Sequence, residues 1–202
     1  MAMHAPMTSN ENAMLTGYVE QQLLAVRGAA YGLTDEELWT TPTASALSVG
    51  AIIKHVARCT QGWLDRIEAA PGEPARGSDQ EAAEEYGADF RRADADTGDS
   101  LRAELTAALE RAQQLLPQVD LGAKVPVPSG APWWPADLDA WDVRWAVLHI
   151  VEEVAHHAGH ADIIRESIDG ATMYELLAAD QNWPETEWMR HWRRAEATAE
   201  AV

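Results

Sequence analysis

The stretch LHIVEEVAHHAGH at residues 148–160 holds four of the seven histidines of the chain and two of its carboxylates. It contains no proline, and its apolar residues recur three or four positions apart, which predicts an amphipathic helix. Residues at that spacing share one face of a helix, and an imidazole and a carboxylate on one face can bind a single divalent ion. The stretch therefore predicts a helix that carries a candidate metal site.

A helical wheel identifies the face of this helix that points into the protein. Val147, Ile150, Val154, Ala161, Ile164 and Ile168 cluster opposite Arg144, Glu152, Asp162 and Glu166. Glu153 and His157 lie near the middle of the inward side. His149 and His160 lie at its margin, and His156 lies about a quarter-turn away or more. A single buried histidine is more often held by hydrogen bonds, but an inward carboxylate is seldom buried without a cation, so this pair favours a metal.

Length and composition predict one globular domain. The chain has 202 residues, of which 47% are hydrophobic and 24% charged. We expect a single domain over residues 1–202, with a core at about 12–170 and a C-terminal extension at 171–202. No run of eighteen apolar residues occurs, and the start lacks the pattern of a signal peptide, so a cytoplasmic protein without membrane contact is expected.

The net charge and the cysteine content restrict which partners the protein can bind and which kind of metal site it can form. The net charge of -18 disfavours binding to nucleic acid and to anionic membranes, because phosphates are held mainly by Lys and Arg. Cys59 is the single cysteine, so an intramolecular disulfide and a cysteine-rich zinc site are both excluded. A metal must therefore be held mainly by histidine and carboxylate side chains.

The sequence pattern predicts helices separated by loops. Apolar periodicity predicts four main amphipathic helices, over residues 10–32, 48–70, 80–116 and from 137 or 139 to 168. The third of these helices is expected to be interrupted near residues 97–100 and to start again at Ser100. Shorter helical segments are predicted at 34–39, 173–179 and 184–199, and a proline-rich connection spans 117–137 with an extended stretch at 124–127. No alternating strand pattern competes. The fold class is therefore all-α, a four-helix bundle with a long connection before the last main helix and short C-terminal helices.

A bundle of this kind builds its sites from side chains on facing helices. His55 lies in the middle of the predicted second helix, on the rim of its apolar face, and Cys59 follows one turn later. If the second and fourth helices pack side by side, His55 meets Glu153 and His157 and leaves coordination positions open. A catalytic role for Cys59 is disfavoured, because a lone buried thiol is more often inert packing.

Tryptophan is unusually common, with nine residues against a single phenylalanine. Several tryptophans flank the candidate site segments. Indole rings bury much apolar area and carry one hydrogen-bond donor, so most of them are expected to pack in the core or against loops. One or two can line a pocket, and Trp63 and Trp145 are the candidates for binding a cofactor or substrate there.

Two motifs carry a resemblance to a known family. The run ExxxHAGHADIIRE at residues 153–166 and the run SVGxxxKH at residues 48–55 resemble the DinB-like superfamily, in particular its actinobacterial branch. They also resemble the N-terminal domains of mycothiol-dependent maleylpyruvate isomerases. The resemblance covers about residues 12–170. It implies a four-helix bundle of DinB-like type, and homodimers are an expectation from the resemblance alone.

The resemblance also implies a metal site. In that superfamily a histidine of the second helix and two residues four apart on a late helix hold a divalent metal, often zinc or nickel. By position these are His55, Glu153 and His157. Other members have His where this chain has Glu153, which leaves the metal's identity open, and several have Gln at the position of His160. The last thirty residues are too short for the isomerase's additional C-terminal domain, so we do not expect its particular reaction here.

Three functional hypotheses follow. In the first, the chain is a metal-dependent transferase that joins a small thiol such as mycothiol to a small electrophile, with His160 or His149 as general base; a hydrolase that uses the same metal is chemically close. In the second, the bundle binds metal without catalysis, in a stress response. In the third there is no metal, and Glu153 forms an ion pair with protonated His55 or His157.

Overall fold

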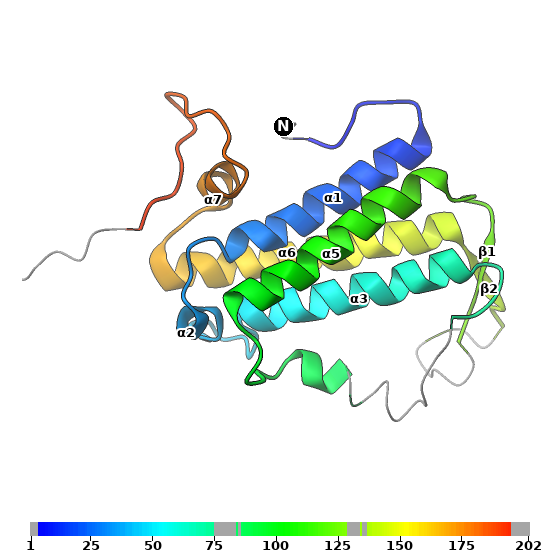
Figure 1. Cartoon of the computed structure of the whole chain (residues 1–202), viewed down its shortest axis with the longest axis horizontal. Coiled ribbons are helices and arrows are strands. Elements are labelled where there is room, and N and C mark those ends of the chain that lie inside the picture. Colours follow the sequence, from blue (N-terminus) through cyan, green and yellow to red (C-terminus); the bar gives the residue numbers. More distant parts are fainter. Residues whose placement is uncertain (1–3, 75–83, 85, 129–133, 135–136, 195–202) are drawn as a thin grey trace, which may run out of the picture.

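Four long helices build the part of the chain that the computed structural model describes, residues 4–74, 84, 86–128, 134 and 137–194. They are α1 (Glu11–Ala29), α3 (Val49–Ala69), α5 (Gly98–Leu115) and α6 (Val143–Asp169). Helix α6 packs against both α1 and α3, and α5 covers the same two helices from the other side. Figure 1 shows the four helices side by side, so the predicted all-α bundle of DinB-like type is confirmed.

Local sequence signals set most helix starts. Ser48 caps α3 by accepting a hydrogen bond from the backbone N–H of Ala51, as predicted. Helix α2 (Asp35–Leu38) begins with a capping box in which Thr34 and Glu37 satisfy each other's backbone N–H groups. Such caps satisfy the N–H groups that the first turn of a helix leaves without partners.

The predicted third helix is divided, as its interruption suggested. Residues 86–89 are helical, a loop follows, and α5 begins at Gly98. The cap of α5 is Thr97, not Ser100, whose hydroxyl instead completes a capping box. The loop is held by a buried ion pair between Lys54 of α3 and Asp96, at 2.7 Å. Residues 80–83 lie outside the described part.

The connection before the last long helix contains two short strands. After the 3-10 helix η1 (Leu116–Gln118), strand β1 (Lys124–Pro126) pairs antiparallel with β2 (Ala140–Asp142). The extended stretch predicted at 124–127 is thereby confirmed. The predicted start of the fourth helix at 137 or 139 was wrong, because residues 140–142 are extended by this pairing and α6 begins only at Val143.

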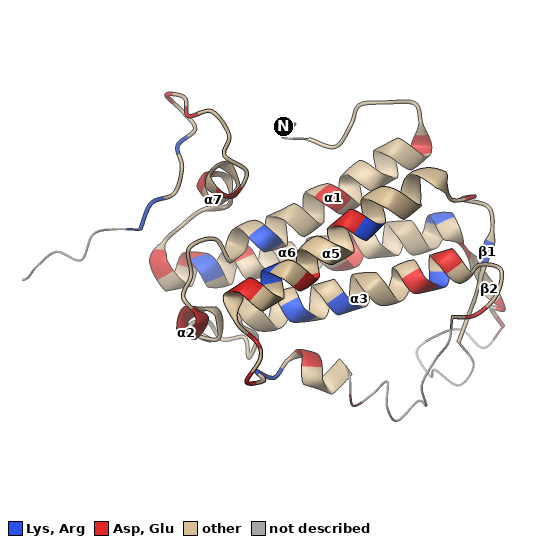
Figure 2. Ribbon diagram, in the orientation of Figure 1, with Lys and Arg blue, Asp and Glu red and all other residues tan. Residues whose placement is uncertain are grey.

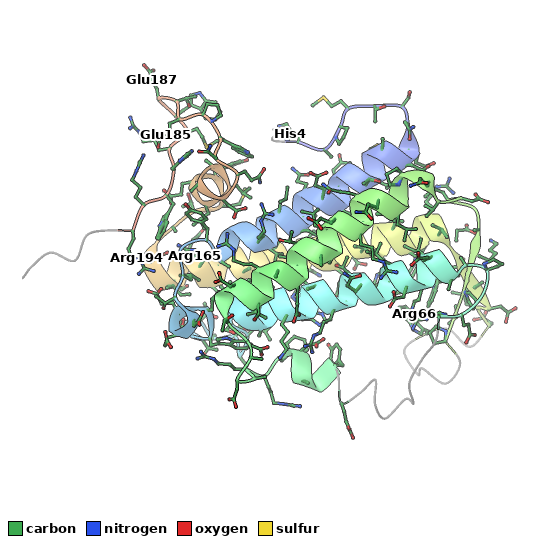
Figure 3. The ribbon with its side chains drawn as sticks, in the orientation of Figure 1. His4, Arg66, Arg165, Glu185, Glu187 and Arg194 are labelled. Carbon is green, nitrogen blue, oxygen red and sulfur yellow. The ribbon has the colours of Figure 1, made fainter. Side chains whose placement is uncertain are left out.

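Beyond α6 the chain turns back over the bundle. Gly170 ends α6 in the left-handed conformation, with φ at 77°, and α7 (Met173–Asp180) follows as predicted. The helix predicted at 184–199 was wrong over 184–194, which form no helix; residues 195–199 lie outside the described part. Tertiary contacts hold this segment instead, because Trp192 stacks on the guanidinium of the fully buried Arg165 at 4.7 Å. Figure 3 shows Arg165 and Arg194 at this end of the bundle.

The bundle interior is mainly apolar, and most charged side chains lie on its outer faces. Val19, Ile52, Leu105 and Ile150, one from each long helix, are at most 1% exposed and belong to one continuous core. Acidic and basic residues are spread along all four helices (Figure 2). Within the described ranges, no helix has both the length and the apolar character needed to cross a membrane.

Candidate metal centre

The structure brings three predicted ligands together between α3 and α6. Nε2 of His55 lies 3.2 Å from Oε1 of Glu153, and Nε2 of His157 lies 3.4 Å from the same oxygen. Glu153 and His157 are four residues apart and therefore share one face of α6. One potential ligand atom from each of these three residues lies within 4.8 Å of the others. The sequence-predicted trio is thus assembled from two facing helices.

The donor set fits a divalent cation. Two imidazole nitrogens and a carboxylate oxygen are ligands that zinc and related divalent metals accept. Donors at about 2.1 Å from a tetrahedral ion lie about 3.4 Å apart, which agrees with the two separations on either side of Glu153. Neither Cys59 nor His160 belongs to this group of ligand atoms. Three residues could therefore hold an ion and leave a coordination position for another molecule.

A fourth side chain, Asp89, orients His55. Its Oδ2 lies 3.4 Å from Nδ1 of His55, and its Oδ1 accepts a hydrogen bond from Arg58 at 2.9 Å. Asp89 is buried, and it reaches the site from the short helical stretch at 86–89. A carboxylate on the outer nitrogen of a ligating histidine fixes the ring and its tautomer. The sequence analysis missed Asp89, because nothing in its local pattern separates it from the many other acidic residues.

The carboxylates around His55 change its charge. Burial alone lowers the pKa of His55, but the hydrogen bonds from its ring to Asp89 and Glu153 outweigh it and raise the pKa to about 9. The pKa of Glu153 is lowered by its hydrogen bonds with His157 and His55. Without an ion, His55 is therefore protonated and paired at neutral pH. This is the arrangement of the third hypothesis, and it is also the state into which an ion would enter.

Aromatic rings cover His55 from the side of the 86–89 segment. Phe90 stacks on the imidazole with 4.8 Å between ring centroids, and Tyr86 meets it edge-on at 5.6 Å. The ring of His157 lies 4.9 Å away on the opposite helix. The imidazole of His55 is thus fixed by packing as well as by hydrogen bonds, which keeps its Nε2 directed at Glu153.

Cys59 lies one turn beyond His55 on α3 but is not activated. Burial raises the pKa of its thiol to about 12, and the negative charges of Glu153 and Asp89 act in the same direction. A thiolate is the nucleophilic form of cysteine. At neutral pH Cys59 is therefore a neutral thiol, which supports the sequence-based preference against a catalytic cysteine.

His149 forms one aromatic cluster with Trp63, Trp134, Trp141 and Trp145. The ring of Trp141 in β2 stacks on that of Trp145 in α6, and Trp145 stacks on His149 of the same helix, with centroids 4.9 and 5.0 Å apart. Trp63 of α3 meets the His149 ring edge-on at 4.8 Å. Because His149 precedes Glu153 by one helical turn, this cluster continues the line of the candidate ligands along α6. The predicted role of Trp63 and Trp145 in binding a cofactor or substrate stays a prediction.

The remaining predicted residues lie at the edge of the site. His160 is partly buried one turn beyond His157, and His156 is exposed, in agreement with the helical wheel. Nδ1 of His149 lies 3.1 Å from a carboxylate oxygen of Glu152, which orients its ring. The roles of His149 and His160 in proton transfer stay predictions.

One residue of α6 differs from its predicted placement. Asp162 was expected on the outward charged face, but it is partly buried and lines a cavity between α1, α6 and α7. The wheel considered α6 alone, whereas residues 4–6, α1 and α7 line the cavity on this side of α6.

Comparison with known proteins assigns the family. Among curated proteins no match is found. The family model described as mycothiol-S-transferase matches residues 14–170, which is more than half of the chain and includes most of α1 and all of α3, α5 and α6. The match thus spans all three candidate ligands and agrees with the bundle. The chain therefore belongs to the mycothiol-S-transferase family, within the DinB-like superfamily.

Proposed function

We propose that the chain is a metal-dependent S-transferase that joins mycothiol, or a similar low-molecular-weight thiol, to a small electrophile. The observation that carries the proposal is the convergence of His55, Glu153 and His157 from two helices beside an inactive cysteine. The family supports a thiol substrate. Since the chain's own thiol is protonated at neutral pH, the reacting sulfur has to come from the second substrate.

In the proposed reaction one bond to the thiol sulfur forms as the bond to the leaving group breaks. The thiol of the substrate loses its proton, its sulfur forms a bond to the electrophilic atom, and the leaving group departs with the bonding electrons. A zinc or nickel ion at the trio would supply the positive charge that favours the thiolate at neutral pH. His160 or His149 takes up the thiol proton, since both are imidazoles within one turn of the ligands on α6. Trp63 and Trp145 contribute an apolar wall for the electrophile.

The number of protein ligands favours catalysis over a purely structural metal. Structural zinc sites are closed by four protein ligands, whereas catalytic sites keep a position free. The group in the structure comprises three residues, and neither Cys59 nor His160 joins it. With three protein ligands, an ion at the trio would keep a coordination position for a substrate sulfur.

The test combines metal content with thiol consumption. Wild-type protein, purified without chelator, should contain about one equivalent of zinc or nickel and should consume mycothiol with at least one member of a panel of alkyl and aryl electrophiles. Glu153→Gln should lose both properties. His156→Ala is the matched control, because it removes an exposed histidine of the same helix, and Cys59→Ser should remain active.

The other hypotheses predict different results. Bound metal without turnover of any thiol or ester would identify a non-catalytic metal-binding bundle. Turnover of an ester that needs metal but no thiol would identify a hydrolase. A metal-free wild type whose melting temperature is unchanged by chelator and by added zinc or nickel would leave only the ion pair between Glu153 and His55.

A further inference from the structure

A second candidate site lies on the side of α6 that faces away from the trio. A cavity of about 330 Å³ lies between α1, α6 and α7, and the N-terminal segment at residues 4–6 forms part of its wall. Asp162, which lines it, is nine positions after Glu153 and so half a turn around the helix from it. None of the candidate ligands lines this cavity, so it is separate from the proposed metal centre.

Asp162 is the chemically conspicuous residue of this cavity. No described residue forms a hydrogen bond or an ion pair with its carboxylate, and Glu166, one turn further along α6, repels it. Burial, followed by this repulsion, raises the pKa of Asp162 to about 6. A carboxylate that is partly withdrawn from water normally has a cationic or hydrogen-bonding partner, so the missing partner points to a ligand.

The other walls complement an ammonium ion that carries an apolar group. Among the described residues that line the cavity, Glu20 of α1 is the second carboxylate, and none is a lysine or an arginine. Leu24 and Leu177 supply an apolar surface. Tyr174 and Trp183 add aromatic rings, whose faces attract cations. A small anion would meet two carboxylates here, and a wholly apolar molecule would leave both of them without a partner.

We propose that this cavity binds a small organic ammonium ion with an apolar body, and that Asp162 is its counter-ion. The volume is at the lower end of the range for small-molecule sites and suits an amine with a single ring or a short alkyl chain. The net charge of -18 raises the local concentration of cations around the whole molecule and favours the same class of ligand. The proposal does not depend on the transferase activity.

Two glycines shape the site and supply test positions. At Gly17 of α1, an added Cβ would lie 2.1 Å from Cδ of Pro6, so the glycine allows the N-terminal segment to lie against the helix beside the cavity. At Gly159 of α6, an added Cβ would meet no atom within 4 Å. A larger side chain at Gly159 can therefore be introduced without a clash at its Cβ, and it would occupy the space in front of Asp162. His4 of this segment lies above α1 in Figure 3.

The experiment is isothermal titration of the full-length protein with three probes at pH 7.5. Phenethylamine carries an ammonium group, 2-phenylethanol is its neutral analogue, and phenylacetate is an anion of similar shape. Phenethylamine should bind with a stoichiometry of one and at least tenfold more tightly than 2-phenylethanol, and phenylacetate should not bind. Equal affinities for the amine and the alcohol, or no saturable heat with the amine, would overturn the proposal.

Three variants assign the binding to this cavity. Asp162→Asn should weaken phenethylamine binding at least tenfold, and Gly159→Leu should abolish it by filling the space. Glu166→Gln is the matched control, because it removes a carboxylate of the same helix outside the cavity and should change the affinity no more than twofold. Retained binding in both Asp162→Asn and Gly159→Leu would overturn the assignment. Metal content should equal that of the wild type in all three variants, which separates this test from that of the transferase.

Discussion

Helix α6 carries two partly buried carboxylates whose surroundings are opposite. Glu153 faces α3, where hydrogen bonds from His157 and His55 lower its pKa. Asp162 faces α1 and α7, where burial and the nearby Glu166 raise its pKa to about 6. Both side chains are carboxylates on one helix, so the difference arises from the groups around them: His55 of α3 and His157 of α6 beside Glu153, and burial together with Glu166 of α6 at Asp162. A carboxylate on a helix becomes a stabilised ligand or an unsatisfied acceptor according to what the rest of the chain packs against it.

The sharpest test of this contrast is metal binding. Glu153→Ala should lower zinc affinity at least about 100-fold, because one of three donors is lost from the group. Asp162→Ala should leave the affinity within twofold of the wild type. Competition with a chromophoric chelator measures both values.

A drop of similar size in the two variants would contradict the contrast, because it would mean that metal affinity follows the net charge of α6 rather than the trio. Glu152→Ala controls for charge close to the site, since Glu152 is exposed and precedes Glu153 directly. It should bind zinc as the wild type does.

The pH dependence of stability gives the second largest effect. In metal-free protein the pKa of His55 is about 9 in the folded state and about 6.5 in the unfolded chain, so protonation of His55 stabilises the fold. This contribution is fully present below pH 6.5 and is lost as the pH rises through 9. The stability lost between these two pH values is about 2–3 kcal/mol. The free energy of unfolding from urea titrations should therefore fall between pH 6.5 and 9.

Glu153 makes the stability of the fold depend on pH in the opposite sense to His55. Its lowered pKa gives a contribution that is present above about pH 4.5 and is lost as the medium becomes more acidic. Removal of the carboxylate in Glu153→Ala should reduce both slopes, and His156→Ala should leave them unchanged. If metal-free wild type and Glu153→Ala show the same slope between pH 6.5 and 9, the pairing of His55 with Glu153 is not formed in solution.

The trio could be predicted from the sequence because each part of it is a local property. The spacing of Glu153 and His157 fixes their common face on any helix, and apolar neighbours fix which face points inward. His55 needed one further assumption, that the second and fourth helices pack together, and α3 and α6 do. Helix caps also depend on local sequence, so the Ser48 cap of α3 and the capping box that begins with Thr34 could be predicted from the sequence.

Apart from the cap of α5, which is Thr97 instead of Ser100, the errors depend on segments far apart in the chain. Residues 140–142 are extended because strand β1 pairs with them, and residues 184–194 are held against the bundle by contacts such as that of Trp192 with Arg165. Asp89 reaches His55 from a short helical segment whose position no local pattern predicts. Asp162 was assigned to solvent because the wheel contains no information about α7.

Asp89 provides the third prediction, a smaller effect on the same site. Asp89→Asn keeps the shape but weakens the acceptor for Nδ1 of His55 and removes the charge next to Arg58. Zinc affinity should fall about tenfold, the lower end for a residue that orients a ligand. Asp94→Asn is the control, since Asp94 is exposed in the loop that follows. An unchanged affinity in Asp89→Asn would show that Phe90 and Tyr86 alone position the ring.

The smallest predicted effect concerns the cost of leaving Asp162 without a partner. Its pKa is raised to about 6, so ionisation in the empty cavity opposes folding. The loss of stability begins near the unfolded pKa of about 4 and is complete somewhat above pH 6. Because Asp162 is only partly buried, the expected cost at pH 7 is about 1 kcal/mol after allowance for solvent screening.

Asp162→Asn should therefore stabilise the free protein at pH 7 by about 1 kcal/mol and should have no such effect at pH 4, where the wild-type carboxyl is largely protonated. Saturating phenethylamine should remove the difference at pH 7 by stabilising only the wild type. Urea titrations at the two pH values, with and without the amine, measure all four free energies. A variant that is less stable than the wild type at pH 7 would mean that Asp162 already has a partner in the folded protein, and the two carboxylates of α6 would then not differ as the structure indicates.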